Sequence, residues 1–289
     1  RRLSRLPPYP FLELDRMKRA ALAAGRPLID FGIGDPDLPT PRAVIAALAR
    51  AARDPGTHRY PLGAGLKAYR EAAAAWYQAR FRVRLDPATE VMALIGSKEG
   101  IAHFPWSVVN PGERVLVPDP GYPVYGASTI LCGGIPVPMP LTHENGFLPD
   151  LRRGLRVRLM FLNYPNNPTG ATAPREFYRR VVALAARYGI IVAHDAAYSE
   201  LYYAEADRPP SFLEIPGARE IGIEFHSLSK TCNMTGWRIG CAVGNARLIA
   251  GLVAFKGNVD SGSFEAVQRA GIAAFRLAPA WARRMSRIY

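Results

Sequence analysis

The sequence predicts an α/β fold: a three-layer α/β/α domain with a mostly parallel sheet, together with part of a smaller α/β domain. Two observations support this prediction. Apolar runs of strand length alternate along the chain with segments whose apolar residues recur at helical spacing, and such alternation is typical of a parallel sheet covered by helices. The 289 residues also exceed one usual domain, which leaves room for part of a second.

The N-terminal part begins with a proline-punctuated arm, and residues 11–24 follow with helical spacing. Residues 28–41 are predicted to start as a short strand and to break into a loop rich in Gly and Pro. Such a loop can bring backbone amides close to a ligand, although a simple linker explains it equally well. Helical spacing recurs over residues 42–53 and 65–82, with Tyr60 in the loop between them.

Residues 91–104 have the pattern of a strand, a tight turn and a helix. The turn Gly96-Ser97-Lys98 would place free N–H groups at the positive end of a helix dipole, which suits a phosphate group. An ordinary strand-to-helix turn with a serine cap explains the same residues equally well.

The middle of the chain repeats the alternation. Strands are predicted over residues 114–117, 135–138, 158–162 and 190–194, a turn over 119–126 and a helix over 174–188. Polar loops that each follow a strand lie at residues 96–98, 119–125, 163–170, 195–198 and 227–230. Because ligands bind beyond the carboxyl ends of parallel strands, we expect these loops to converge on one crevice.

The segment Glu224–Asn245 is the most informative stretch. It begins as an alternating apolar run, breaks into a small-residue loop that holds Lys230, and resumes through Arg238 into a predicted strand over residues 239–243. The chain has 5 lysines and 32 arginines, so a lone lysine among Ser, Thr, Asn and Gly is not generic surface charge. An amine can form a Schiff base with an aldehyde and a guanidinium cannot, so the loop predicts covalent chemistry at Lys230.

Composition argues against several other classes of function. The net charge of +13 comes from scattered arginines without a nucleic-acid motif, so we expect attraction of small anions and no nucleic-acid partner. No apolar run approaches the roughly 20 residues that span a bilayer, and no signal peptide is visible, so a cytoplasmic protein without a membrane partner is expected. Cys132, Cys232 and Cys241 lack metal-ligand spacing, which predicts neither a metal nor a disulfide. Nucleotide-binding glycine fingerprints are missing as well.

Brought into one crevice, the polar side chains of these loops match one cofactor, pyridoxal phosphate. Lys230 would bind its aldehyde as a Schiff base and act as general base, and Asp195 would pair with the ring nitrogen and keep it protonated. Arg238, Ser227 and the turn at 96–98 would hold the phosphate.

The cofactor ring would have its own partners. Tyr122 would stack on one face with Ala197 against the other, and Asn167 and Tyr198 would hydrogen-bond the phenolate oxygen. Each residue also has a plainer explanation, since the two tyrosines could be core aromatics and Asp195 a helix cap. Their joint occurrence favours the cofactor.

Four motifs carry a family resemblance: DPGYPVY (119–125), NYPNNPTG (163–170), DAAYSEL (195–201) and SLSKTCNMTGWRIG (227–240). In this order they resemble the class I and II pyridoxal-phosphate-dependent aminotransferases, which have the aspartate aminotransferase fold (fold type I). The resemblance covers nearly the whole chain. The stretches FGIGDPDLPTP, THRYPLGAGLKAYREA and GSKEGIAHF look most similar to the LL-diaminopimelate aminotransferase branch.

The resemblance implies a role for each matched residue. Catalysis falls to Lys230, Asp195 and Tyr198, and substrate binding to Gly34 and Asn167. The implied cofactor-binding residues are Ser97, Lys98, Tyr122, Asn167, Asp195, Tyr198, Ser227, Lys230, Arg238 and Tyr60. Tyr60 resembles the tyrosine that reaches the phosphate in the neighbouring subunit, so the resemblance also implies a homodimer.

The implied reaction is ping-pong transfer of an amino group from an L-amino acid to a 2-oxo acid such as 2-oxoglutarate. On the narrower resemblance the donor would be LL-diaminopimelate. Two alternatives stay open at this point: another pyridoxal-phosphate enzyme on the same fold, such as a C–S lyase or a decarboxylase, and a truncated, non-catalytic protein of that fold.

The expected organisation is an N-terminal arm with part of a small domain (1–40), a large cofactor-binding domain (41–262) and the start of a helix (263–289) that leads to a C-terminal small domain. We expect the chain to be an excerpt of a longer one. In the family an arginine of that C-terminal domain holds the substrate carboxylate, and neither Arg283 nor Arg284 has the context to replace it. A native protein that ended here would be expected to transaminate weakly or not at all.

Overall fold

The computed structural model describes residues 1–32, 34–61, 63–151 and 156–289, so Ile33 and Leu62, each inside a quoted motif, lie outside the described residues. The strands are β1 (Val91–Leu94), β2 (Arg114–Asp119), β3 (Ile135–Pro140), β4 (Leu159–Asn163), β5 (Ile191–Asp195), β6 (Gly222–Ser227) and β7 (Gly240–Gly244). The α-helices are α1 (Pro10–Ala23), α2 (Arg42–Ala52), α3 (Lys67–Phe81), α4 (Ser97–Val108), α5 (Val124–Cys132), α6 (Arg175–Tyr188), α7 (Ala218–Ile221), α8 (Leu228–Thr231), α9 (Ala246–Gly257) and α10 (Glu265–Met285). Short 3₁₀ turns are η1 (Leu3–Arg5), η2 (Pro55–His58), η3 (Glu205–Asp207), η4 (Phe212–Glu214) and η5 (Thr235–Trp237).

The strands form one seven-stranded sheet in the order β1-β7-β6-β5-β4-β2-β3. Strand β7 runs antiparallel to its neighbours β1 and β6, and the other adjacent pairs are parallel. The sheet is therefore mostly parallel, as predicted. Because β7 is reversed, its first residue, Gly240, lies beside Leu94 and Ser227, the last residues of β1 and β6.

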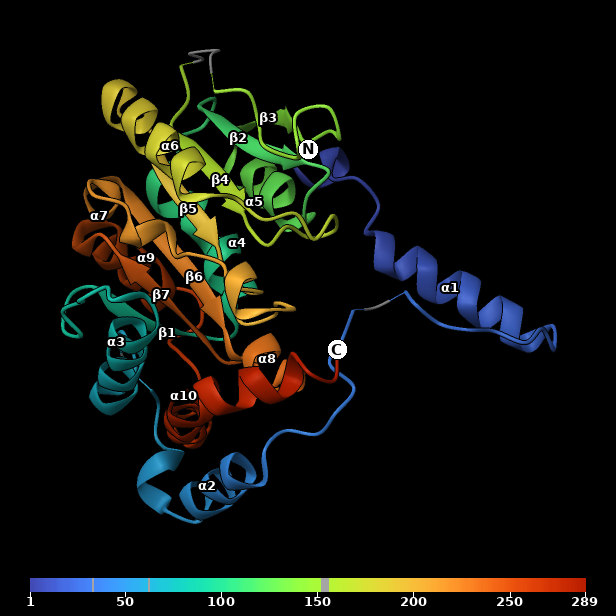
Figure 1. Ribbon diagram of the computed structural model, residues 1–289, viewed down its shortest axis with the longest axis vertical. Coiled ribbons are helices and arrows are strands. Elements are labelled where there is room, and N and C mark those ends of the chain that lie inside the picture. Colours follow the sequence, from blue (N-terminus) through green and yellow to red (C-terminus); the bar gives the residue numbers. More distant parts are fainter. Residues whose placement is uncertain (33, 62, 152–155) are drawn as a thin grey trace.

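Helices cover both faces of the sheet (Figure 1). Successive side chains of a strand point to opposite faces, and β1 shows the consequence: Val91 and Ala93 pack in a core with α3, α6 and α10, whereas Met92 and Leu94 pack in a second core with α4, α5 and α9. These two cores on either side of one sheet confirm the predicted three-layer α/β/α architecture.

Strand β6 carries polar side chains into the core, and every one of its residues is buried. Glu224 accepts four hydrogen bonds: from the hydroxyls of Tyr77 and Ser211 at 2.9 and 2.8 Å, from His194 Nδ1 at 2.8 Å and from the Phe212 N–H at 2.9 Å. Burial raises the pKa of Glu224, but the hydrogen bonds from His194, Ser211 and Tyr77 outweigh it, and the pKa lies below its ordinary value. The carboxylate is therefore a fully satisfied part of the core.

Replacing Glu224 by leucine is expected to lower the free energy of unfolding by about 3 kcal/mol or more, because four buried donors lose their acceptor and each costs about 1–3 kcal/mol. Urea unfolding followed by circular dichroism measures the change. Glu176→Leu, at an exposed acid of α6, is the matched control and should shift the free energy by less than about 0.5 kcal/mol. Similar losses in both variants would contradict the structural importance of the buried carboxylate.

Three local predictions are wrong. Residues 28–31 form no strand: Ile29 and Phe31 are 82% and 92% exposed, and no described strand pairs with them. Lys230 lies on the short helix α8 and not in a loop, because Ser227 Oγ accepts the Ser229 N–H at 3.1 Å and begins a helical turn. The turn predicted over 119–126 already runs into helix α5.

The N-terminal helix α1 projects away from the body of the protein (Figure 1). None of its residues is buried, and its apolar Leu12 and Met17 are exposed. At the lower end of the same view α2 packs against α10. The division of the chain after residues 40 and 262 stays a prediction. Within the described ranges, no helix has the length and apolar character needed to cross a bilayer.

Candidate active site

A cavity of about 1230 Å³ opens at the edge where the parallel strands end. The strand-end loops meet there, as the topology requires. Of the residues proposed from the sequence, those lining the cavity are Gly34, Ser97, Lys98, Tyr122, Asn167, Asp195, Ala197, Tyr198, Ser227, Lys230 and Arg238. Tyr60 is the exception: its side chain is 86% exposed and does not line the cavity.

Asp195, at the end of β5, is the buried acid of the cavity. One carboxylate oxygen accepts the Tyr125 hydroxyl at 2.8 Å and the other accepts the Ala197 N–H at 3.2 Å. Burial raises the pKa of Asp195 to about 6, although these two hydrogen bonds lower it. A desolvated carboxylate of this kind is stabilised by a cationic partner. Tyr125 was not proposed from the sequence; its position three residues after Tyr122 in the same motif was the available signal.

Lys230 projects from α8 toward the N-terminal segment. Its Nζ donates to the Gly34 carbonyl at 2.8 Å and pairs with the Asp35 carboxylate at 3.1 Å. Its side chain is 16% exposed, whereas that of Asp35 is 51% exposed. The sequence pointed to the backbone of Gly34 as a substrate contact and gave no sign of Asp35. In this structure both residues hold the amine at the cavity wall.

The turn before α4 has the features of an anion site. Gly96 has φ 73°, and no described side chain caps the helix, so the first-turn N–H groups of Ser97 and Lys98 point to the helix end without a side-chain acceptor. The Arg238 guanidinium lies against this turn: a Cβ on Gly96 would come within 2.6 Å of its Nη2 atom. Glycine is therefore required both for the backbone angle and for the approach of Arg238.

The Lys98 ammonium points elsewhere. It donates to the Tyr9 hydroxyl at 3.1 Å and lies 5.6 Å from the centre of the Tyr122 ring. The backbone N–H of Lys98 thus belongs to the anion site, whereas its ammonium group is directed toward Tyr9 and Tyr122. Tyr9 belongs to the N-terminal arm, where the sequence showed no chemical pattern that would have identified it.

Asn167 and Tyr198 form the third side of the cavity. Asn167 Nδ2 lies 3.4 Å from the Tyr198 hydroxyl, and its backbone N–H donates to Asn163 at 2.7 Å. Asn163 in turn donates to the Asp195 carbonyl at 3.0 Å, which ties the two loops together. Burial raises the pKa of Tyr198 to about 12, so its hydroxyl is a hydrogen-bond donor at neutral pH.

The donor set fits pyridoxal phosphate. A buried carboxylate suits the cationic ring nitrogen, an amine suits the aldehyde, and an uncapped helix start beside a guanidinium suits the phosphate. The family model described as aminotransferase class I and II matches residues 26–287. The chain belongs to the class I and II aminotransferases. It is a pyridoxal-phosphate-dependent enzyme that transfers an amino group from an L-amino acid to a 2-oxo acid.

The relatives agree with this membership. The aminotransferase is 55% identical to an LL-diaminopimelate aminotransferase of Syntrophobacter fumaroxidans, with 100% of this chain and 75% of that protein covered. It is 57% identical to a protein of the same name from Desulforudis audaxviator, with 95% and 71% covered. Among solved structures, substrate-bound BacF of Bacillus subtilis matches with a TM-score of 0.94 and 37% identity, over 100% of this chain and 74% of that one. These findings support fold type I and amino transfer, and do not support the lyase, decarboxylase or non-catalytic alternatives.

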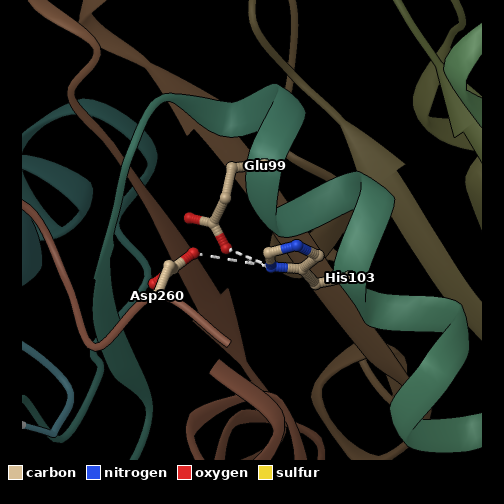
Figure 2. Close-up of side chains that lie close together, drawn as sticks. All are labelled: Glu99, His103 and Asp260. Carbon is tan, nitrogen blue, oxygen red and sulfur yellow. Dashed lines mark hydrogen bonds and ion pairs between the residues drawn. The ribbon is translucent and has the colours of Figure 1, made fainter. Parts of the chain in front are cut away.

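Outside the cavity, three side chains of metal-ligand type lie close together: Glu99 and His103 of α4, and Asp260 from the loop after α9, with ligand atoms within 4.8 Å of one another (Figure 2). Lys256 Nζ donates to Glu99 at 2.9 Å and to Asp260 at 2.5 Å, and its side chain is 1% exposed. A metal ion would have to displace a buried ammonium that pairs with both carboxylates. The group is therefore an internal charge network.

Proposed function

We propose that the aminotransferase uses LL-diaminopimelate as amino donor and 2-oxoglutarate as acceptor. The observation that carries the proposal is the 55% and 57% identity to relatives of that name. The cavity adds physical support, because its wall offers a cation, Lys98, and an anion, Asp35, in addition to the buried acid. A donor with an amino and a carboxylate group at each end can use both charges.

Bound in this cavity, pyridoxal phosphate supplies an electron sink for the negative charge that develops at the substrate α-carbon. In the proposed mechanism Lys230 holds the aldehyde and afterwards moves a proton to and from that carbon with its Nζ atom. To do so it must leave Asp35, whose exposed carboxylate is then free to contact solvent or substrate. Asp195 keeps a proton on the ring nitrogen through its desolvated negative charge.

The remaining residues orient the cofactor. In the proposal Tyr198 and Asn167 donate hydrogen bonds to the phenolate oxygen, and Tyr122 stacks on the ring. The proposed phosphate ligands are Ser97, Lys98, Ser227 and Arg238. Asn167 and Gly34 are proposed to contact the substrate.

The proposal includes a homodimer in which Tyr60 reaches the phosphate of the partner's cofactor. It is supported by the exposure of Tyr60 outside the cavity of its own chain and by the exposed apolar side chains of α1. A second copy would cover such surfaces. A cytoplasmic location belongs to the same proposal and is supported by three buried, unpaired cysteines.

The substrate is tested by measuring glutamate formation from 2-oxoglutarate with the cofactor-loaded protein and a panel of donors. We expect kcat/KM for LL-diaminopimelate to exceed that for meso-diaminopimelate, N-succinyl-LL-diaminopimelate and L-aspartate by about tenfold or more, since a site with polar groups placed for one donor rejects donors that leave them unpaired. A preference for L-aspartate or for the succinylated donor would reject LL-diaminopimelate while leaving amino transfer in place.

A further inference from the structure

Lys256 is a buried amine that does not line the cavity. Its ammonium is held between Glu99 and Asp260. His103 Nδ1 completes the group at 2.8 Å from Glu99 and 3.8 Å from Asp260, and Figure 2 shows these three side chains. Burying an ammonium costs several kcal/mol unless it is paired and hydrogen-bonded. Lys256 therefore fixes the two carboxylates relative to each other.

Glu99 connects this network to the anion site. The oxygen that accepts from Lys256 also accepts the backbone N–H of Ile95, at 2.9 Å. Ile95 precedes Gly96, and Glu99 is the third residue of α4. A single carboxylate thus connects both ends of the turn that carries Ser97. Burial raises the pKa of Glu99, but the hydrogen bonds from His103 and Lys256 and the positive charge of Lys256 outweigh this effect. The pKa lies below its ordinary value, and the carboxylate stays ionised.

Asp260 extends the network in the other direction. The Lys256 carbonyl accepts the N–H groups of Asp260 and Ser261 at 3.0 and 3.2 Å, which closes the loop after α9. Two residues after Asp260, Gly262 faces Pro61, because a Cβ on Gly262 would lie 3.5 Å from the proline ring. Pro61 directly follows Tyr60, so the loop supports the segment that is proposed to reach the partner's phosphate.

We infer that Lys256 is a positioning residue for the phosphate end of the cofactor, acting through Glu99 on the turn at residues 95–98 and through Asp260 on the segment beside Tyr60. It touches neither the cofactor cavity nor the reacting atoms. The inference rests on the proposed phosphate site of Ser97 and Arg238, and the experiment separates the two.

The test compares binding of two probes to the cofactor-free protein: pyridoxal phosphate and pyridoxal, which lacks the phosphate. In Lys256→Met we expect the Kd for pyridoxal phosphate to rise about tenfold, the effect of about 1.4 kcal/mol of misplaced phosphate contacts. The Kd for pyridoxal should change by less than about twofold, because the ring and aldehyde partners lie elsewhere. Absorbance and tryptophan-fluorescence titrations give both constants without measuring turnover.

Matched variants separate position from charge. Glu99→Ala removes the acceptor of Ile95 and should match Lys256→Met, whereas the Glu99→Gln amide oxygen can still accept from Ile95 and should keep the pyridoxal phosphate Kd within about threefold. Lys67→Met, at an exposed lysine of α3, should leave both constants unchanged.

Each outcome has a distinct meaning. If Lys256→Met weakens the binding of pyridoxal phosphate and of pyridoxal equally, Lys256 only stabilises the fold, and the inference is overturned. Arg238→Met tests the phosphate site itself: if it does not lose preference for pyridoxal phosphate over pyridoxal, the proposed site fails. If Arg238→Met loses the preference for pyridoxal phosphate over pyridoxal and Lys256→Met keeps it, the phosphate site stands and only the positioning role of Lys256 is rejected. Should Lys256→Met not fold, an unchanged pyridoxal phosphate Kd in Glu99→Ala overturns the inference.

Discussion

Replacing Lys230 by alanine is expected to lower kcat for amino transfer by about 10⁴-fold, because the variant loses both the amine that holds the aldehyde and the general base. Glutamate formation in the presence of excess pyridoxal phosphate measures the loss. The absorbance of the bound cofactor should at the same time change to that of the free aldehyde. Both changes are expected because no other lysine lines the described cavity except Lys98, whose ammonium faces Tyr9.

Two further variants define this result. Lys230→Arg keeps the charge beside Asp35 but has no nucleophilic amine, so it should be as inactive as Lys230→Ala. Lys18→Ala, at a half-exposed lysine of α1, should keep kcat within about twofold. A Lys230→Ala protein that retained more than about one hundredth of the native kcat would remove Lys230 from its proposed role.

Asp195→Asn is expected to lower kcat by about 10³-fold, the size of effect seen when one preorganised electrostatic contact is removed from a desolvated site. The amide is nearly isosteric and can still accept from Tyr125, so the fold should be kept while the charge that holds the ring-nitrogen proton is lost. Asp207→Asn, at an exposed position, is the control. Near-native turnover in Asp195→Asn would contradict the assignment.

The pKa of Asp195, about 6, gives this prediction a pH signature. The folded value lies above the ordinary 3.8, so folding of the cofactor-free protein favours the protonated acid below about pH 6, and the stability that it contributes is lost as the pH rises from about 4 through about 6. The ionised acid is the form that pairs with a cationic ring. Cofactor affinity should therefore increase with pH through about 6, and Asp195→Asn should remove this dependence.

The residues that end parallel strands could be predicted from the sequence because the topology alone places them together. Helices that are buried on both sides could not be predicted from the sequence. Helix α5 has nine residues without a charge, six of them buried, so its pattern shows no polar face that would distinguish it from a turn. The strand predicted over residues 28–31 failed for the opposite reason: an apolar run indicates a strand only where a neighbouring strand accepts its hydrogen bonds.

The contacts that hold the site residues in place could not be predicted from the sequence either. Tyr125 and Asn163 lie inside the quoted motifs, but only the fold shows that they contact Asp195. Glu224 looks in the sequence like the polar position of a half-exposed strand, yet its partners Tyr77 and Ser211 come from distant segments and bury it completely. Such hydrogen bonds depend on three-dimensional proximity, which the spacing of residues along one chain does not encode.

The reversed strand β7 has a consequence for how the site assembles. Because β6 ends and β7 begins at the same edge, Lys230 and Arg238 are only eight residues apart in the chain although they are proposed to bind opposite ends of the cofactor. Closing so short a loop costs less conformational entropy than closing the long crossovers that deliver Asp195 and Asn167. The separation of Lys230 and Arg238 is thus set within one hairpin, whereas the long-range topology brings Asp195, Asn167 and the turn of Ser97 to the site.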